Sequence, residues 1–268
     1  MQENFSRNRF TSPRSLRRIV LVVAFWLASG LLPVGAFGAV MIWPLDPVIE
    51  GDQTGVALWV ENRGTQGQTM QLRVLSWTQE AGRNVYMPQS TLVGTPAMFR
   101  VEPGKRQLIR LTRTQMPASA REVAYRLLID EVPDQASVAS AQTSAVSAPA
   151  AGLRFQVRYS IPLFSYGAGL ASSKNSGANA PQLVWRQGTD DGRRWIEVRN
   201  LGQTHAKLAA ISVRDSNGKT LDAENGKLGY VLAGSYARWQ LPVNAAAPVA
   251  VLSGIDGGEV RQLDREMP

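Results

Sequence analysis

Apolar and polar residues alternate along most of the chain after residue 40, in short stretches separated by turn signals. Met70–Trp77 is one such stretch, and Val56–Val60 is another that ends at the turn-like sequence 61–64. Because side chains of a β-strand point to opposite faces with a period of two, this alternation predicts half-buried strands. Similar stretches cover 107–111, 123–129, 153–164, 183–185, 195–198, 208–213, 230–232 and 239–241. No long segment has helical periodicity, and many short, evenly spaced strands are typical of β-sandwiches.

Two changes in composition divide the chain. Residues 134–152 are rich in Ala and Ser and nearly uncharged, which predicts a loop, and residues 167–181 are rich in Gly, Ser, Ala and Asn. Because the strand-like stretch 153–164 lies between them, we interpret 134–152 as a loop inside the first domain; an interdomain linker is the alternative. The sequence thus predicts two sandwiches of about 100 residues each, over 39–165 and 166–268.

The N-terminus has the pattern of an export signal. Five Arg residues precede Ile19–Leu32, an uninterrupted run of 14 mostly apolar residues, and Ala36-Phe37-Gly38 fits a small-x-small cleavage site. The run is shorter than the roughly 20 residues that span a bilayer. Residues 1–38 are therefore predicted to be a cleaved signal peptide, which leaves a mature periplasmic chain without a membrane anchor. A retained anchor is the alternative.

Export changes the meaning of the net charge. The chain has 29 basic and 21 acidic residues, but five of the basic residues and one of the acidic ones lie in 1–38, so the remainder carries +4 rather than +8. No later basic run is interleaved with aromatic residues, and we expect no nucleic-acid partner. The absence of Cys excludes disulfides and thiolate chemistry, and it is compatible with the periplasm.

The chain offers little for catalysis. His205 is the only histidine, and no phosphate-binding, dinucleotide-binding or zinc-protease motif occurs. The sequence Asp190-Asp191-Gly192 is more typical of a hairpin turn than of a metal site. We therefore expect no enzyme, no cofactor and no metal, and we favour a structural role for His205. A hydrolase that uses His205 as its base is the weakest hypothesis.

One stretch carries an unusually long apolar stripe. Its alternate positions are Leu153, Phe155, Val157, Tyr159, Ile161 and Leu163. These six side chains share one face of a strand. Pro162 cannot donate a ladder hydrogen bond, which favours an edge strand, and an exposed apolar edge promotes aggregation unless it pairs with another chain. The alternative is a half-buried strand that packs on its own domain.

Several short motifs follow one another in a specific order. They are PVIEG at 47–51, WVEN at 59–62, FRVEPGKRQLIR at 99–110, YRLLIDEVP at 125–133, SIPLF at 160–164, VRNLG at 198–202 and GYVLAG at 229–234. In this order the mature chain resembles the PapD-like periplasmic chaperones of the chaperone–usher pathway, and its SIPLF motif is most similar to their archaic or alternative branch. The resemblance implies an all-β fold of two immunoglobulin-like β-sandwich domains set at an angle, like a boomerang, with a client cleft between them.

The resemblance also implies a function. Such chaperones bind pilin-like subunits by donor-strand complementation, in which the chaperone lends a strand to the incomplete sandwich of the subunit, and deliver them to an outer-membrane usher for pilus assembly. By position, 153–163 would be the donor G1 strand, with the stripe filling the subunit groove, and 134–152 the preceding F1–G1 loop. The sequence does not decide whether the free chaperone caps this edge with a second copy of itself, as a dimer.

Charged residues depart from the family pattern. Type members hold the subunit's C-terminal carboxylate with an Arg and a Lys, and by counting along the motifs these positions are Asp46 and Pro162, which cannot bind a carboxylate. Arg126 is the candidate anchor instead, because arginine can bind a carboxylate through two parallel hydrogen bonds. Arg158 is the second candidate, although it lies on the face opposite the stripe.

The acidic residues leave alternatives open. Glu122 and Asp256 match the acidic members of an interdomain ionic cluster in the family, whose Arg falls at Tyr166 here. Glu122 or Asp130 could instead form a salt bridge with Arg126 inside the first domain, which would make Arg126 a structural residue.

A different class of function is a secreted two-domain adhesin or carbohydrate-binding module, with Trp residues as stacking platforms. Trp59, Trp77 and Trp239 lie in apolar strand contexts, so we expect core positions for them instead.

Overall fold

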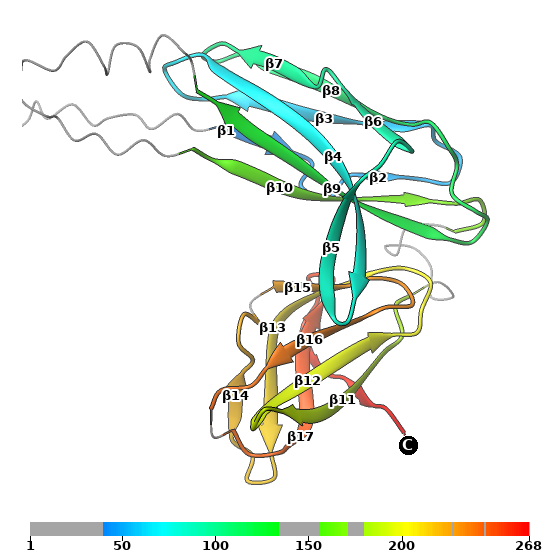
Figure 1. The fold of residues 1–268 in the computed structure, drawn as a ribbon, viewed down its shortest axis with the longest axis vertical. Helices are drawn as coiled ribbons and strands as arrows, with labels where there is room; N and C mark the ends of the chain where they lie inside the picture. The colour runs from blue at the N-terminus through cyan, green and yellow to red at the C-terminus, as the bar shows by residue number, and fades with distance from the viewer. Residues whose placement is uncertain (1–39, 134–155, 171–179, 227, 244, 268) are drawn as a thin grey trace, which may run out of the picture. The chain divides into compact units, whose positions relative to one another are not determined.

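The computed structural model describes residues 40–133, 156–170, 180–226, 228–243 and 245–267 (Figure 1). All regular secondary structure within these ranges is β-strand, so the predicted all-β fold class is confirmed. None of the described segments is a helix with the length and apolar character that a membrane crossing requires. The predicted signal peptide 1–38 and the predicted loop 134–152 lie outside the described residues.

Among the described residues, ten strands form the first sandwich. They are β1 (Val40–Trp43), β2 (Val48–Ile49), β3 (Gly55–Asn62), β4 (Gln68–Glu80), β5 (Arg83–Pro88), β6 (Leu92–Thr95), β7 (Met98–Val101), β8 (Arg106–Arg113), β9 (Glu122–Val132) and β10 (Arg158–Tyr166). One sheet has the order β1-β3-β8-β6, and the other has the order β2-β10-β9-β4-β5 with β7 also paired to β4. All pairs are antiparallel except β2 with β10, which is parallel.

Nine strands form the part of the second sandwich that the structure describes. They are β11 (Leu183–Asp190), β12 (Arg193–Asn200), β13 (Ala206–Asp215), β14 (Thr220–Asp222), β15 (Leu228–Val231), β16 (Tyr236–Gln240), β17 (Pro248–Ile255), β18 (Val260–Gln262) and β19 (Asp264–Arg265). The sheets have the orders β16-β12-β11-β19 and β14-β13-β17-β18, with β15 also paired to β13. Asp191 and Gly192 have φ of 49° and 76° and join β11 to β12, so the hairpin predicted at this position is confirmed.

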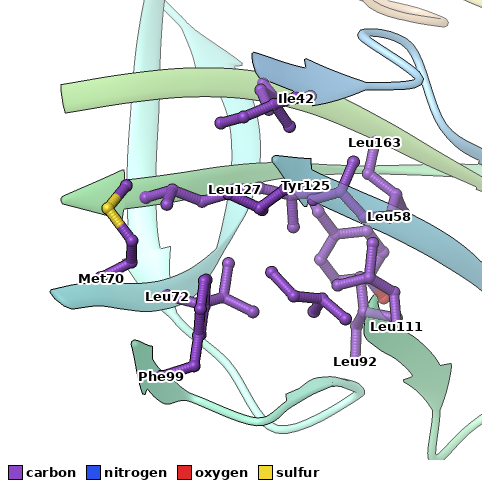
Figure 2. Packing of buried hydrophobic residues seen from close by; sticks show 14 of the residues in the cluster. Ile42, Leu58, Met70, Leu72, Leu92, Phe99, Leu111, Tyr125, Leu127 and Leu163 are labelled. Carbon is purple, nitrogen blue, oxygen red and sulfur yellow. The ribbon is translucent and has the colours of Figure 1, made fainter. Parts of the chain in front are cut away.

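Alternation along the strands builds a separate core in each sandwich. In the first, Tyr125 and Leu127 of β9 meet Leu58 of β3 and Leu163 of β10, as Figure 2 shows. Each large apolar side chain buried in this way contributes about 1.5–3 kcal/mol. In the second sandwich the buried cluster contains Trp185, Ile196 and Trp239, among others.

The prediction of a core position is wrong for Trp59. Its neighbours Leu58 and Val60 are fully buried, so Trp59 lies on the opposite, outer face of its sheet. There it is stacked beside Trp43 of β1, with ring centroids 6.5 Å apart and planes inclined by 13°. Trp77 and Trp239 are buried, at 2% and 7% exposure, although Trp77 packs outside the sandwich core in a smaller aromatic cluster.

Candidate functional site

Strand β10 has one flank, called here the open flank, that no strand of the described residues covers over its first half. In the register with β9, Glu131 N–H donates to the carbonyl of Val157 at 3.2 Å, and on the other side Phe164 N–H donates to the carbonyl of Pro47 at 3.2 Å. Because antiparallel partners alternate between hydrogen-bonded and non-bonded pairs, odd-numbered residues of β10 bond to β9 and even-numbered residues face the opposite flank. On that flank, no described strand pairs with β10 before β2 meets Phe164 and Ser165.

The main-chain groups on the open flank are those of an unpaired edge. They are the N–H and C=O of Arg158 and Ser160 and the C=O of Pro162, whose ring stands where an N–H would otherwise face outward. The flank spans the first part of the strand only, since Phe164 is already bonded to Pro47. An incoming extended segment could therefore pair with the first half of β10. It would stop where β2 pairs with Phe164 and Ser165, at the C-terminal end of the strand, which we call the base of β10.

The side chains of the apolar stripe do not share one environment. Val157 is 40% exposed and lies just before β10, whose first described strand residue is Arg158. Tyr159 is half-buried, whereas Ile161 and Leu163 are 4% and 0% exposed in the core of the same sandwich. Leu153 and Phe155 lie outside the described residues.

This distribution corrects the predicted donor set. From Tyr159 onward, the odd-numbered face of β10 is the face that covers its own core, so Ile161 and Leu163 have no side chain to offer a client. Only stripe residues that precede the strand could insert their side chains into a client. Among the described residues, Val157 is such a residue.

Arg126 lies on the outer face of the sheet, in register with Pro162 on one side and Leu75 on the other. The residue is only 9% exposed, and its guanidinium carbon lies 4.0 Å from the centroid of the Trp77 ring. Tyr86 and Tyr230 complete an aromatic surround at 5.6 and 6.0 Å. Such cation–π contacts stabilise a guanidinium without neutralising its charge.

Arg126 has no carboxylate partner in the part of the chain that the structure describes, and its Nε is buried without a hydrogen-bond acceptor. The salt bridge considered as an alternative is not formed, since Asp130 and Glu122 are bonded elsewhere. A buried charge is normally paired, because leaving it uncompensated is costly. The site is therefore electrostatically favourable for an anion from outside the described chain.

Arg158, the second candidate anchor, is in a different situation. Its Nε donates to Asp130, and Arg73 Nη2 donates to the other carboxylate oxygen of Asp130 at 2.9 Å. Burial alone would raise the pKa of Asp130, but the hydrogen bonds from Arg158 and Arg73 outweigh it and hold this pKa below its usual value. Arg158 thus already has a carboxylate partner, which makes it the weaker candidate.

The two predicted ionic residues, Glu122 and Asp256, accept hydrogen bonds from different main-chain N–H groups, and both carboxylates act on Tyr166. Glu122 accepts hydrogen bonds from the backbone N–H of His205, at 3.1 Å to each oxygen, and its Oε2 lies 2.8 Å from His205 Nδ1. Asp256 instead accepts the backbone N–H of Lys207 at 3.0 Å. Burial, reinforced by the Glu122 charge, raises the pKa of Tyr166 far above its usual value, and Tyr166 also hydrogen-bonds to Glu122.

An aromatic cluster surrounds this contact. Phe164 is stacked on the His205 ring at a centroid distance of 3.3 Å with the planes 5° apart, and Trp77 and Tyr230 lie 5.9 and 6.2 Å from Phe164. The sequence indicated a structural role for His205 but not its partner, because Glu122 is 83 residues away and no local motif links the two residues.

A family model and solved structures identify the class of protein. Residues 44–171 match the family described as "Pili and flagellar-assembly chaperone, PapD N-terminal domain". No curated protein matches the sequence.

The fold is similar to a chain of the CsuC–CsuE chaperone–tip adhesion subunit pre-assembly complex from archaic chaperone-usher Csu pili of Acinetobacter baumannii. The TM-score is 0.68 at 25% identity, over 85% of this chain and 100% of that one. The E. coli chaperone DraB gives 0.55 at 19% identity over 86% and 98%, and the SafA pilin–SafB chaperone complex of Salmonella enterica gives 0.55 at 18% over 85% and 95%.

The fold is therefore that of a two-domain pilus-assembly chaperone. The first sandwich thus matches the PapD N-terminal domain family, and the described residues share the fold of pilus chaperones, which the sequence motifs resemble.

Proposed function

We propose that this protein is a non-enzymatic periplasmic chaperone that holds pilin-like subunits by donor-strand complementation and delivers them to an outer-membrane usher. The observation that carries the proposal is the open flank of β10, where the main-chain groups of Arg158, Ser160 and Pro162 have no described strand beside them. Pairing with an edge of this kind supplies main-chain hydrogen bonds, and side chains at alternate positions supply specificity. No cofactor or metal is required for this activity.

The donor segment in this proposal is the stretch before and at the start of β10. Leu153, Phe155 and Val157 would enter the subunit groove, with Tyr159 at the edge of the contact, while the buried Ile161 and Leu163 fix the strand to its own domain. The domain limits 39–165 and 166–268 and the F1–G1 loop at 134–152 belong to the same proposal. When no subunit is bound, a second copy of the chain could cap the same flank.

Arg126 is the proposed anchor for the subunit's C-terminal carboxylate. It lies one strand away from the open flank, in register with Pro162, and it is a buried cation without a carboxylate partner among the described residues. A carboxylate that reaches it would satisfy the free Nε and neutralise the charge. Asp46, the family's Arg position, carries the wrong charge for this task.

The test is co-expression with a pilin-like subunit encoded next to this protein. The subunit is expected to stay soluble and resistant to proteolysis only when the chaperone is present. Val157→Asp, alone and together with Phe155→Asp, is expected to lower subunit recovery at least tenfold, because a carboxylate cannot enter an apolar groove without losing its hydration.

A matched control is Val93→Asp, which places the same charge at a valine of similar exposure, 46%, on β6 in the other sheet. It should leave recovery unchanged. Equal loss of the subunit with both variants, or a subunit that is soluble without the chaperone, contradicts the proposal.

A further inference from the structure

We infer that His205 of the second sandwich is a positioning residue for β10: it fixes the base of the strand so that the open flank extends from a rigid end. This inference rests on the proposed role of β10 as donor strand. The residue does not itself touch the open flank, and it acts through Phe164 and through Glu122.

His205 holds the base by two independent contacts. Its ring is stacked on Phe164, the first residue of β10 that pairs with β2 on the otherwise open flank. Its main-chain N–H and its Nδ1 both contact the Glu122 carboxylate, and Glu122 is the register partner of Tyr166, the last residue of β10. The side chains of His205 and Glu122 are only 12% and 2% exposed, so both contacts are shielded from water.

The first sandwich holds the same base from its other sides. Arg113 of β8 donates to the carbonyls of Tyr166 and Gly51, each at 2.9 Å, and Gly167 N–H donates to the carbonyl of Arg121 at 2.9 Å. A Cβ atom at residue 167 would lie 1.9 Å from the carbonyl oxygen of Ala118, so only glycine fits at this position. His205 adds contacts from the second sandwich, where Tyr230 also lies 6.2 Å from Phe164.

The mechanical consequence follows from the pairing of β10. Between Arg158 and Leu163 the strand has a single described neighbour, β9, so its direction is set by that ladder and by the fixed base. Loosening the base would let the open half change its angle to β9. A subunit strand must align with every open main-chain group at once, and such a loss of pre-organisation lowers affinity without removing any contact.

The experiment measures amide hydrogen exchange in the free protein and subunit capture in parallel. His205→Ala is expected to speed exchange of the Phe164 and Gly167 amides about tenfold, since losing a buried hydrogen bond to a charged group shifts a local opening equilibrium by at least that factor. Subunit capture should fall by a similar factor. His205→Asn, which keeps an N–H donor but no ring, should be intermediate and serves if the alanine variant folds poorly.

The matched control is Gln79→Ala, which removes a different contact with the second sandwich. Gln79 Nε2 donates to the carbonyl of Tyr230 at 2.7 Å, and Leu232 N–H donates to Gln79 Oε1 at 2.9 Å. This variant should speed exchange of the Leu232 amide but not of Phe164.

Unchanged exchange at Phe164 in both His205 variants overturns the inference, as does equal acceleration in Gln79→Ala, which would indicate general loosening between the sandwiches. Failure of the unaltered protein to capture any subunit would count against the proposed function instead, because the exchange measurement needs no client.

Discussion

Each sandwich contains an arginine stacked on a tryptophan, and the two arginines differ in what surrounds them. Arg126 lies 4.0 Å from the Trp77 ring centroid, and Arg238 lies 3.9 Å from that of Trp195. The Nε of each is buried without an acceptor. Arg238, however, binds Asp190 at 2.9 Å and Glu197 at 3.1 Å, whereas no described carboxylate reaches Arg126.

The difference separates a structural cation from a binding one. Glu197 is fully buried, and it is held by Arg186 at 2.6 Å as well as by Arg238. Burial alone would raise the pKa of Glu197, but the hydrogen bonds from these two arginines outweigh it and lower this pKa. The charges around Glu197 thus neutralise one another, whereas Arg126 has no carboxylate partner among the described residues. The distance to the tryptophan ring is nearly the same at the two sites, whereas their counter-ions differ.

The largest expected effect comes from removing the buried counter-ion. Glu197→Gln should destabilise the protein by about 2–3 kcal/mol in urea unfolding, because the arginines around it would face one another with no negative charge between them. Asp190→Asn is the matched control: its side chain is 55% exposed, and the loss should stay below about 1 kcal/mol. Similar losses for the two variants would contradict the structural assignment.

Acid provides a second test of the same carboxylate. Because the folded-state pKa of Glu197 is lowered, its stabilisation is complete above the ordinary value of 4.5 and is lost as the pH falls through the folded pKa. The gap in unfolding free energy between the unaltered protein and Glu197→Gln should therefore be constant near neutral pH and shrink below about pH 4.5. A gap that widens in acid would show that Glu197 does not act through its charge.

The next effect contrasts the two arginines directly. Arg126→Met should change the stability of the free protein by less than about 1 kcal/mol, since an apolar side chain can replace an unpaired buried charge at little cost, and should weaken subunit binding about tenfold. Arg238→Met should lower stability and leave subunit binding intact. A subunit with an amidated C-terminus should bind the unaltered protein and Arg126→Met equally; a remaining difference between them would argue against carboxylate anchoring.

The smallest effect is expected at Arg158, whose side chain is 60% exposed. Arg158→Ala should cost less than about 1 kcal/mol, because exposed ion pairs contribute little and Asp130 keeps Arg73. Titration with the subunit should show a smaller change in affinity than Arg126→Met produces. A larger loss of subunit affinity in Arg158→Ala than in Arg126→Met would make Arg158 the better candidate for the carboxylate anchor.

Sequence periodicity predicted much of this architecture. Alternation gave the strands around Val60, Leu72, Ile109 and Leu127, since a period of two follows directly from backbone geometry. It also indicated that β10 is a strand with one apolar face. It did not show where the apolar stripe leaves the core: Ile161 is buried in the strand, whereas Val157, just before the strand, is exposed.

The same limit applies to single residues. Trp59 lies in an apolar strand, yet it faces outward, because the residues on either side of it take the inward face. Residue type made Arg126 a candidate anchor, but nothing in its neighbourhood along the chain reveals that Asp130 and Glu122 are both bonded elsewhere.

The amino-acid sequence by itself determined that this is an all-β protein, with the motifs of a pilus chaperone, because strand periodicity and turn residues are local properties. Tertiary structure alone decided which flank of β10 stays open, which arginine lacks a counter-ion and where His205 is placed. These features depend on groups brought together from distant parts of the chain, and electrostatic and packing partners across such distances leave no local pattern.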